Sequence, residues 1–201
     1  RPDDAHVPVS RLVVLGNTHR GQAISLAQMQ AASNAAREAG LAVHLDGARL
    51  FNAAIARGIT ADTLAATAET GSLCLSKGLA APAGTVLVGD KATLARARRW
   101  RKMLGGGMRQ SGILAAAGRH ALAHNVERLA DDHAHAATLA GHLTDIGAGD
   151  PAAPPRQATN MVFFTPRAEE RDALMAAMTS KGILLGGQRP TMRIVLHKDI
   201  D

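Results

Sequence analysis

A lysine follows directly on a short apolar run in the first half of the chain, and its position constrains both the fold and the chemistry. Residues 73–75 are Leu-Cys-Leu, and Ser76, Lys77 and Gly78 come next. The run predicts a short buried strand that delivers Lys77 to a loop. Lysine is rarely buried, so a lysine at the mouth of an apolar strand favours a chemical role. A desolvated lysine loses its proton, and the free amine then forms a Schiff base with a carbonyl compound.

An aspartate stands at the end of an earlier strand. Residues 42–45 predict that strand, Asp46 follows it, and residues 49–57 predict a helix. About 30 residues separate Asp46 from Lys77, which is the length of a strand–helix–strand unit. The right-handed crossover makes the two strands parallel, so both side chains emerge at the sheet edge where ligands of open α/β sheets bind. An amine for an aldehyde and a carboxylate for a pyridinium nitrogen is the pair that pyridoxal phosphate requires.

The rest of the chain also alternates apolar strands and helices. We expect further strands at residues 11–15, 84–89, 160–164, 183–185 and 192–196, and further helices at residues 26–39, 91–103, from 108 or 109 onward, 126–143 and 168–181. This order predicts an α/β fold with a mainly parallel sheet, to which residues 84–89 return antiparallel. The Pro-rich segment 150–155 is the clearest linker. We expect a partial large domain over residues 1–124 and a small C-terminal α/β domain over residues 125–201.

Composition restricts the class of protein. With three Phe, one Trp and no Tyr in 201 residues, Ala, Leu, Val and Met must fill the core. The single Cys74 cannot form an internal disulfide, which favours a reducing compartment and a cytoplasmic location. Neither an 18-residue apolar run nor a signal pattern is present, so the sequence does not predict a membrane partner.

The formal net charge of +6 raises the possibility of a nucleic-acid partner. The densest basic cluster lies on the expected helix 91–103 and spreads over more than one of its faces, with Trp100 as its one aromatic residue. This pattern favours a solvated or anion-facing helix over a nucleic-acid surface. His133, His135 and His142 share a helical region, but without a nearby Glu or Cys they make a poor metal site, so we expect no metal.

Three long blocks together identify a family. The blocks are HLDGARLFNAA (residues 44–54), SLCLSKGLAAPAGTVLVG (72–89) and RRWRKMLGGGMRQSGILAAAG (98–118). They closely resemble the low-specificity L-threonine aldolases, which are fold-type-I pyridoxal-phosphate enzymes, and the likeness covers nearly all of residues 1–201. The resemblance implies cleavage of L-threonine and L-allo-threonine to glycine and acetaldehyde, as part of threonine catabolism and glycine biosynthesis. It also implies a homotetramer with shared active sites.

The resemblance assigns roles to individual residues. Lys77 binds the aldehyde carbon of the cofactor, Asp46 keeps the pyridine nitrogen protonated, and Ser76 contacts the phosphate. Arg193 binds the substrate carboxylate, and Arg49 lies beside the cofactor, where it is a second candidate for the carboxylate. A guanidinium suits this task because it pairs with a carboxylate through two hydrogen bonds and stays charged.

Three further residues have weaker assignments. His6, in the segment PDDxH, resembles the histidine that handles the substrate hydroxyl in the family. Lys102 and Arg109 flank the triple glycine at residues 105–107, at a boundary between active site and subunits in the family. The glycines themselves predict either an anion-binding nest or a hinge.

The chain also departs from the family pattern. The Gly-Thr turn that grips the cofactor phosphate and the ring that stacks on the pyridine lie ahead of these blocks in the family, and neither is found here. Gly16 stands where relatives usually carry glutamate before Asn-Thr-His. We therefore expect a fragment of a longer enzyme, inactive by itself. Two alternatives stay open: a related β-eliminating lyase of the same fold, and a truncated scaffold without cofactor.

Overall fold

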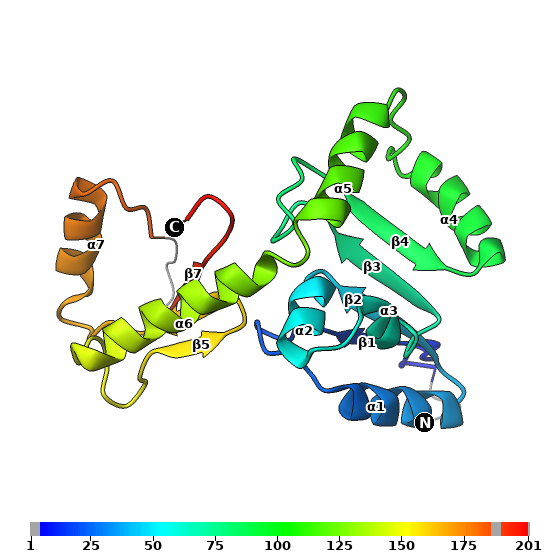
Figure 1. The fold of residues 1–201 in the computed structure, drawn as a ribbon. Helices are drawn as coiled ribbons and strands as arrows, with labels where there is room; N and C mark the ends of the chain where they lie inside the picture. Colours follow the sequence, from blue (N-terminus) through cyan, green and yellow to red (C-terminus); the bar gives the residue numbers. More distant parts are fainter. Residues whose placement is uncertain (1–4, 186–189, 201) are drawn as a thin grey trace. The chain divides into compact units, whose positions relative to one another are not determined.

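The computed structural model describes residues 5–185 and 190–200, and the chain forms two compact units. The large unit comprises Arg1–His19 and Ala23–Val126, and the small unit comprises Arg20–Gln22 and Glu127–Asp201. Each unit is described by itself (Figure 1).

The large unit is built on one four-stranded sheet. Its strands lie in the order β1 (Leu12–Gly16), β2 (Ala42–Gly47), β3 (Thr70–Cys74) and β4 (Thr85–Gly89). β1, β2 and β3 are parallel, and β4 pairs with β3 in the antiparallel direction, which confirms the expected arrangement.

Three helices cover one face of this sheet: α1 (Leu26–Glu38), α2 (Leu50–Arg57) and α3 (Ala61–Ala65). Val43 and Leu45 alternate along β2, and both are 0% exposed because they point into this layer. Ser25 and Gln28 form a reciprocal capping box that starts α1. The expected single crossover helix between β2 and β3 is thus two helices, separated after the left-handed Gly58.

The opposite face of the sheet carries the residues that alternate with this core. Leu12 pairs with Ala42 and Val14 with His44, so these four share the face of Asp46. Leu12 is 52% exposed and Val14 is 57% exposed. Asp46 therefore projects from the side of β2 that α1, α2 and α3 leave open.

Two more helices complete the large unit, α4 (Lys91–Met103) and α5 (Gly112–His124). The triple glycine closes α4: the N–H of Gly105 donates to the carbonyl of Lys102, and that of Gly106 to the carbonyl of Arg101. Two of the three glycine N–H groups therefore donate to helix carbonyls and are not available to an anion. The prediction of an anion-binding nest is wrong. The cap also shifts the start of α5 to Gly112, beyond the expected position at residue 108 or 109.

The small unit packs two helices with an antiparallel sheet. Its elements are α6 (Leu129–Asp145), β5 (Arg156–Ala158), β6 (Met161–Phe164), α7 (Arg171–Ser180) and β7 (Met192–Val195), with the strand order β5-β6-β7. Ala136 and Ala140 of α6 pack against Val162 and Leu196. Two expectations fail here: residues 183–185 form no strand, and the helix expected at 126–143 begins at Leu129.

The expected core composition is confirmed. The largest fully buried side chains are mainly those of Met, Leu and Val. Within residues 5–185 and 190–200, none of the helices has the length and apolar character needed to cross a bilayer.

Candidate active site

Asp46 lies at the carboxyl end of the central part of the sheet. It pairs with Gly16 of β1 and Ser72 of β3, so the ends of three parallel strands meet at this residue. Its side chain is exposed, and one carboxylate oxygen accepts a hydrogen bond from the N–H of Ala48 at 3.1 Å. The backbone carbonyl accepts from the N–H of Asn17 at 3.0 Å. These contacts fix the carboxylate at the edge where the sequence predicted it.

His44 shares the open face with Asp46, two residues earlier on β2. Its Nδ1 lies 2.8 Å from the hydroxyl oxygen of Thr70 on β3. This cross-strand hydrogen bond stabilises the pairing of β2 with β3. The structure thus gives His44 a structural contact.

Lys77 follows β3 in an ordered loop. The strand ends at Cys74 and not at the lysine, because the chain bends at residues 75–77 and turns at residues 78 and 79. Leu75 is buried, whereas Ser76 and Lys77 are exposed. In this chain the lysine thus lies in a loop, as expected, with its side chain exposed to solvent. Within residues 5–185 and 190–200, the Lys77 amine forms no hydrogen bond and no ion pair, so it is available to a ligand.

Backbone hydrogen bonds define the shape of this lysine loop, which we take as residues 75–84. The N–H of Leu75 donates to the carbonyl of Gly84 at 3.0 Å and closes the loop at its base. Within it, the N–H of Ala80 donates to the carbonyl of Lys77 at 2.8 Å, and that of Ala81 to the carbonyl of Leu75 at 3.0 Å. Ala80 has a φ of 57°, a left-handed conformation that is unusual for alanine.

Arg49 is the third expected residue at the Asp46 edge. It is half-buried at the N-cap of α2, three residues after Asp46, and its carbonyl accepts from the N–H of Ala53. The structure therefore brings Asp46 and Arg49 together on one turn, next to the end of β3 that leads to Lys77.

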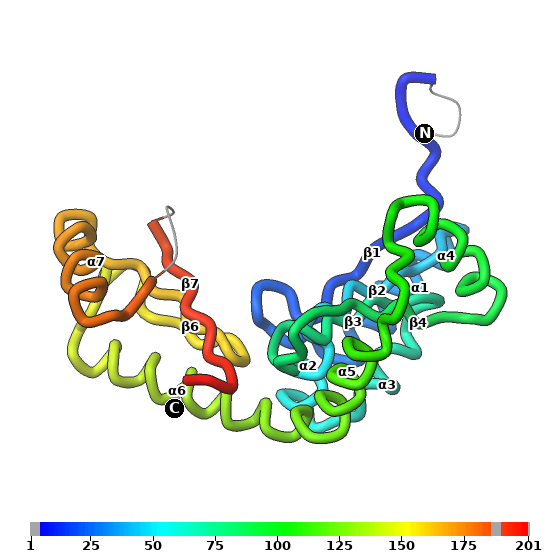
Figure 2. The backbone as a smooth tube through the Cα atoms, turned by 90° about the horizontal axis from the view of Figure 1, so that it is seen from above, coloured from blue at the N-terminus to red at the C-terminus, as the bar shows by residue number. Residues whose placement is uncertain are grey.

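His6 lies in an exposed turn ahead of β1. β1 enters the sheet at Leu12, beside Ala42, which is the end of β2 opposite to Asp46. Figure 2 shows the segment ahead of β1 leading away from the sheet. The described structure does not bring His6 to the Asp46 edge, and its role stays a prediction.

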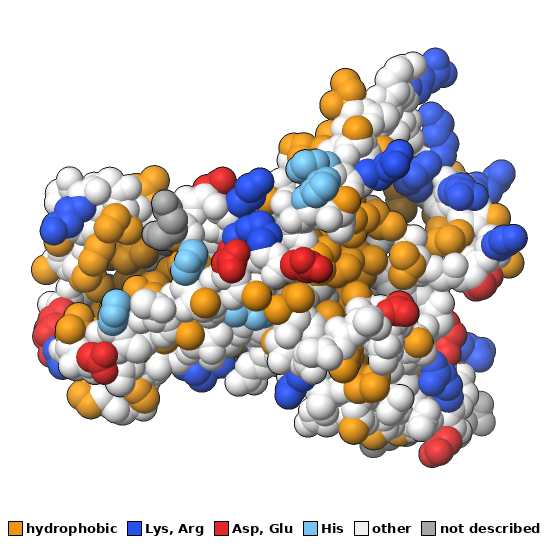
Figure 3. All heavy atoms as spheres, viewed as in Figure 1, with side chains coloured by type: hydrophobic (Ala, Val, Ile, Leu, Met, Phe, Trp, Pro, Cys, Tyr) orange, Lys and Arg blue, Asp and Glu red, His pale blue; other side chains and the backbone are white. Residues whose placement is uncertain are grey.

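Lys102 and Arg109 are exposed on either side of the triple glycine. The stem of Lys102 packs on Gly107, where an added Cβ would lie 2.6 Å from Cδ of the lysine. α4 has no buried residue, and its Lys and Arg side chains form a blue patch in Figure 3. The basic side chains of this helix are exposed, as expected for a solvated or anion-facing helix.

Arg193 belongs to the small unit, on β7. It is exposed, while its neighbour Met192 is buried, so the arginine points away from the apolar core formed with α6. Arg193 pairs with Phe163 of β6, and the guanidinium of Arg156 lies 4.6 Å from the centre of the Phe163 ring. The guanidinium of Arg193 thus stands on a solvent-facing surface beside an aromatic ring.

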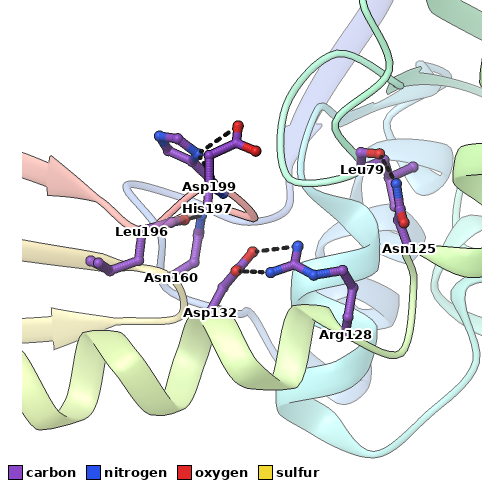
Figure 4. Close-up of polar contacts among 8 residues, drawn as sticks. All are labelled: Leu79, Asn125, Arg128, Asp132, Asn160, Leu196, His197 and Asp199. Atoms are coloured by element: carbon purple, nitrogen blue, oxygen red, sulfur yellow. Dashed lines mark hydrogen bonds and ion pairs between the residues drawn. The ribbon is translucent and has the colours of Figure 1, made fainter. Parts of the chain in front are cut away.

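The histidines of α6 do not form a metal site in the described part of the chain, where no cluster of three metal-binding side chains occurs. His133 is half-buried, and this burial lowers its pKa, while the neighbouring Asp132 partly opposes the shift. Asp132 is itself buried and pairs with Arg128 one turn earlier in the chain (Figure 4).

Two buried asparagines were missed by the sequence analysis. Asn17 is fully buried and exchanges two hydrogen bonds with the backbone of Ile24, at 3.1 and 3.0 Å. Asn125, at the end of α5, donates to the carbonyl of Leu79 in the lysine loop at 2.8 Å (Figure 4). These three hydrogen bonds join a side chain to backbone outside the helix and strand ladders, so no periodicity in the sequence predicts them.

The donor set suits pyridoxal phosphate. The exposed Lys77 amine, which has no partner among the described residues, matches the aldehyde of the cofactor, and the Asp46 carboxylate, outside any described ion pair, matches its ring nitrogen. Ser76 adds an exposed hydroxyl beside the amine. The residues present therefore fit this cofactor at the carboxyl edge of β2 and β3.

Comparison with known proteins identifies the family. The family model described as beta-eliminating lyase matches residues 1–169. The low specificity L-threonine aldolase of Escherichia coli O157:H7 is 44% identical over 200 residues, which is 100% of this chain and 59% of that protein. The low-specificity L-threonine aldolase 1 of Arabidopsis thaliana is 39% identical over 200 residues, covering 96% of this chain and 56% of that protein.

Solved structures agree on the fold. A putative L-allo-threonine aldolase from Listeria monocytogenes EGD-E matches 96% of this chain and 56% of its own, with a TM-score of 0.76 at 22% identity. A putative aromatic amino acid beta-eliminating lyase/threonine aldolase from Exiguobacterium sp. 255-15 matches 92% of this chain and 55% of its own, with a TM-score of 0.75 at 22% identity.

The α/β fold with a mostly parallel sheet is thus the fold of these enzymes. The chain spans 59% of the length of the Escherichia coli protein. The resemblance seen in the three sequence blocks is confirmed, and the chain belongs to the beta-eliminating lyase family.

Proposed function

We propose that this chain forms part of a pyridoxal-phosphate-dependent aldolase that cleaves L-threonine and L-allo-threonine to glycine and acetaldehyde. The observation that carries the proposal is the placement of Asp46 near the carboxyl end of β2 and of Lys77 in the loop after the adjacent parallel strand β3. The match of 96% or more of this chain to part of two proteins named low-specificity L-threonine aldolase supports the choice of substrate.

Each role in the proposal follows from the chemistry of a side chain. When bound, pyridoxal phosphate supplies a ring that accepts the electron pair released as the Cα–Cβ bond breaks. Lys77 binds the aldehyde carbon and gives way to the substrate amine. Asp46 holds a proton on the ring nitrogen, so that the ring keeps its positive charge. The exposed hydroxyl of Ser76 and the guanidinium of Arg109 are assigned to anionic groups of the cofactor.

Three residues are assigned to the substrate. Arg193 binds the carboxylate through two parallel hydrogen bonds, which orients the Cα–Cβ bond, and Arg49 and Lys102 contribute positive charge. His6 accepts the proton of the β-hydroxyl group as the carbon–carbon bond breaks. The proton that reaches Cα afterwards completes glycine, and the aldehyde fragment leaves as acetaldehyde.

We further propose a cytoplasmic homotetramer that acts in threonine catabolism and glycine formation. The single Cys74, unpaired within the chain, supports a reducing compartment. Exposed Trp100, Met103, Leu104 and Ile113 support a subunit contact over α4 and the start of α5. Analytical ultracentrifugation of the complete gene product tests the oligomer.

Product analysis tests the proposed function. The complete gene product, supplied with pyridoxal phosphate and L-threonine, is expected to form glycine and acetaldehyde in equal amounts. Elimination is the second candidate, favoured by the description of the matching family model. It would release ammonia and a keto acid in place of glycine, and that outcome would replace the aldolase assignment.

A further inference from the structure

One face of α5 packs on the lysine loop. Gly118, Ala121 and Asn125 are buried, whereas the residues between them are exposed. Their spacing of three and four residues places all three on one side of the helix. The two ends of this buried stripe, Gly118 and Asn125, contact residues of the lysine loop.

Two contacts join the stripe to the loop. A Cβ built on Gly118 would lie 2.8 Å from Cδ1 of Leu75, so only glycine allows this close approach without a shift of the leucine. Two turns later, the side-chain amide of Asn125 donates to the carbonyl of Leu79 at 2.8 Å (Figure 4). Asn125 is 6% exposed and Leu79 is 2% exposed, so water does not replace this hydrogen bond.

The two contacts bracket Lys77. Leu75 lies two residues before the lysine and Leu79 two residues after it, and both are buried while Lys77 is exposed. A misplacement of a reacting group by about 1 Å can lower the rate of an enzyme reaction by about 100-fold. The anchors on either side therefore decide where the amine stands.

We propose that Gly118 and Asn125 are positioning residues for Lys77, which hold the lysine loop so that the amine stays at the Asp46 edge of the sheet. The inference rests on the proposed function, because it assigns Lys77 the task of binding the cofactor aldehyde. Neither residue touches the cofactor in this account; both act through the backbone of the loop.

The test uses Asn125→Asp, because the carboxylate keeps the shape of the side chain but removes the donor and faces the carbonyl of Leu79. Asn160→Asp is the matched control. Asn160 is 1% exposed and donates to the carbonyl of Leu196 at 2.9 Å, the same kind of bond in the small unit. Gly118→Ala is compared with Gly141→Ala, a helical glycine whose added Cβ would meet no atom within 4 Å.

The first readout is amide hydrogen exchange at Leu75, Ala80 and Ala81 in the complete gene product without cofactor. The N–H groups of these residues form the hydrogen bonds of the loop. Asn125→Asp is expected to raise their exchange rates at least about tenfold. Asn160→Asp is expected to leave these exchange rates unchanged, even if it lowers the melting temperature as much as Asn125→Asp does. Equal protection in Asn125→Asp and the parent, or equal loss in both variants, would overturn the inference.

The second readout is labelling with pyridoxal phosphate and borohydride, mapped by peptide analysis. The ratio of label on Lys77 to label on Lys91 is expected to fall several-fold in Asn125→Asp and in Gly118→Ala, and to hold in Asn160→Asp and Gly141→Ala. If Lys77 is not the preferred site of labelling in the parent protein, the proposed function is contradicted. The exchange result then decides whether Gly118 and Asn125 hold the lysine loop. A parent that labels Lys77, with unchanged labelling in Asn125→Asp, contradicts the positioning role alone.

Discussion

Arg37 and Glu69 form an ion pair, with Nε of the arginine 2.7 Å from one carboxylate oxygen, that ties the end of α1 to the residue before β3. The second oxygen accepts from the N–H of Val43 on β2 at 2.6 Å. The hydrogen bond from Arg37 is the main reason that the pKa of Glu69 lies below its usual range, and the N–H of Val43 acts in the same direction. This carboxylate therefore fixes the amino-terminal part of the strand that carries Asp46 at its other end.

Glu69→Gln is expected to lower the stability at neutral pH and to flatten its acid dependence. Because the pKa of Glu69 is lowered in the folded state, its contribution is present above the unfolded carboxyl pKa and is lost as the pH falls through the folded value. The side chain is 44% exposed, so the loss at pH 7 is about 1 kcal/mol or less. The melting temperature of Glu69→Gln should lie below that of the parent at pH 7, and this difference should shrink below about pH 4. Glu38→Gln, an exposed glutamate on α1, is the control, and an identical pH profile for both variants would rule out this role.

Lys77→Ala and Asp46→Asn are expected to fail in different ways in the complete gene product. Lys77→Ala removes the amine, so the visible absorption of covalently attached cofactor should vanish. Asp46→Asn keeps the attachment but cannot hold the proton on the ring nitrogen, so turnover should fall by at least about 100-fold. Absorption spectra, borohydride reduction and peptide mapping check both. A label on Lys102, Lys91 or Lys181 in place of Lys77 would overturn the assignment of the site.

Arg193→Lys is expected to raise the KM for L-threonine by roughly 10- to 100-fold. A single ammonium cannot make the two parallel hydrogen bonds of a guanidinium, and a charged hydrogen bond contributes about 1.5–3 kcal/mol. Steady-state kinetics measure the change. Arg156→Lys, on the strand at the other edge of the same small sheet, should leave the KM alone. Unchanged kinetics in Arg193→Lys would remove this residue from the substrate site.

His6→Ala is expected to lower turnover by about 10²–10⁴-fold while cofactor absorbance stays intact, because general-base catalysis typically contributes this much. His135→Ala, which removes an exposed histidine of α6, serves as the control. Turnover at the parental rate in His6→Ala would assign the base to another group, most simply water.

The sequence predicts the large unit well where local signals are complete. α4 runs over the expected residues because Asp90 caps its start and the glycines cap its end. The position of Asp46 follows from the alternation along β2. The sequence does not show that Lys77 is exposed, because that depends on how the chain bends at residues 75–77 after the strand.

Other features depend on contacts that a local pattern does not contain. β5 is three residues long and exists because it pairs with β6, so Arg156–Ala158 gives no strand signal of its own. Residues 183–185 are apolar but find no partner strand among the described residues. Asn125 is bound to a carbonyl 46 residues away, which only the tertiary structure reveals.

The antiparallel return of β4 gives the lysine loop a closed base, since the N–H of Leu75 meets the carbonyl of Gly84. The free energy of closing a loop rises slowly with its length, by about 0.6 kcal/mol for each doubling. An insertion at the exposed, left-handed Ala80 would therefore leave the sheet nearly as stable. Because Ala80 lies beyond Leu79, the added residues would enter the loop outside the segment whose two anchors hold Lys77. The length of the loop beyond Leu79 can therefore change, in evolution or by engineering, without rebuilding the sheet and without lengthening the segment that carries the lysine.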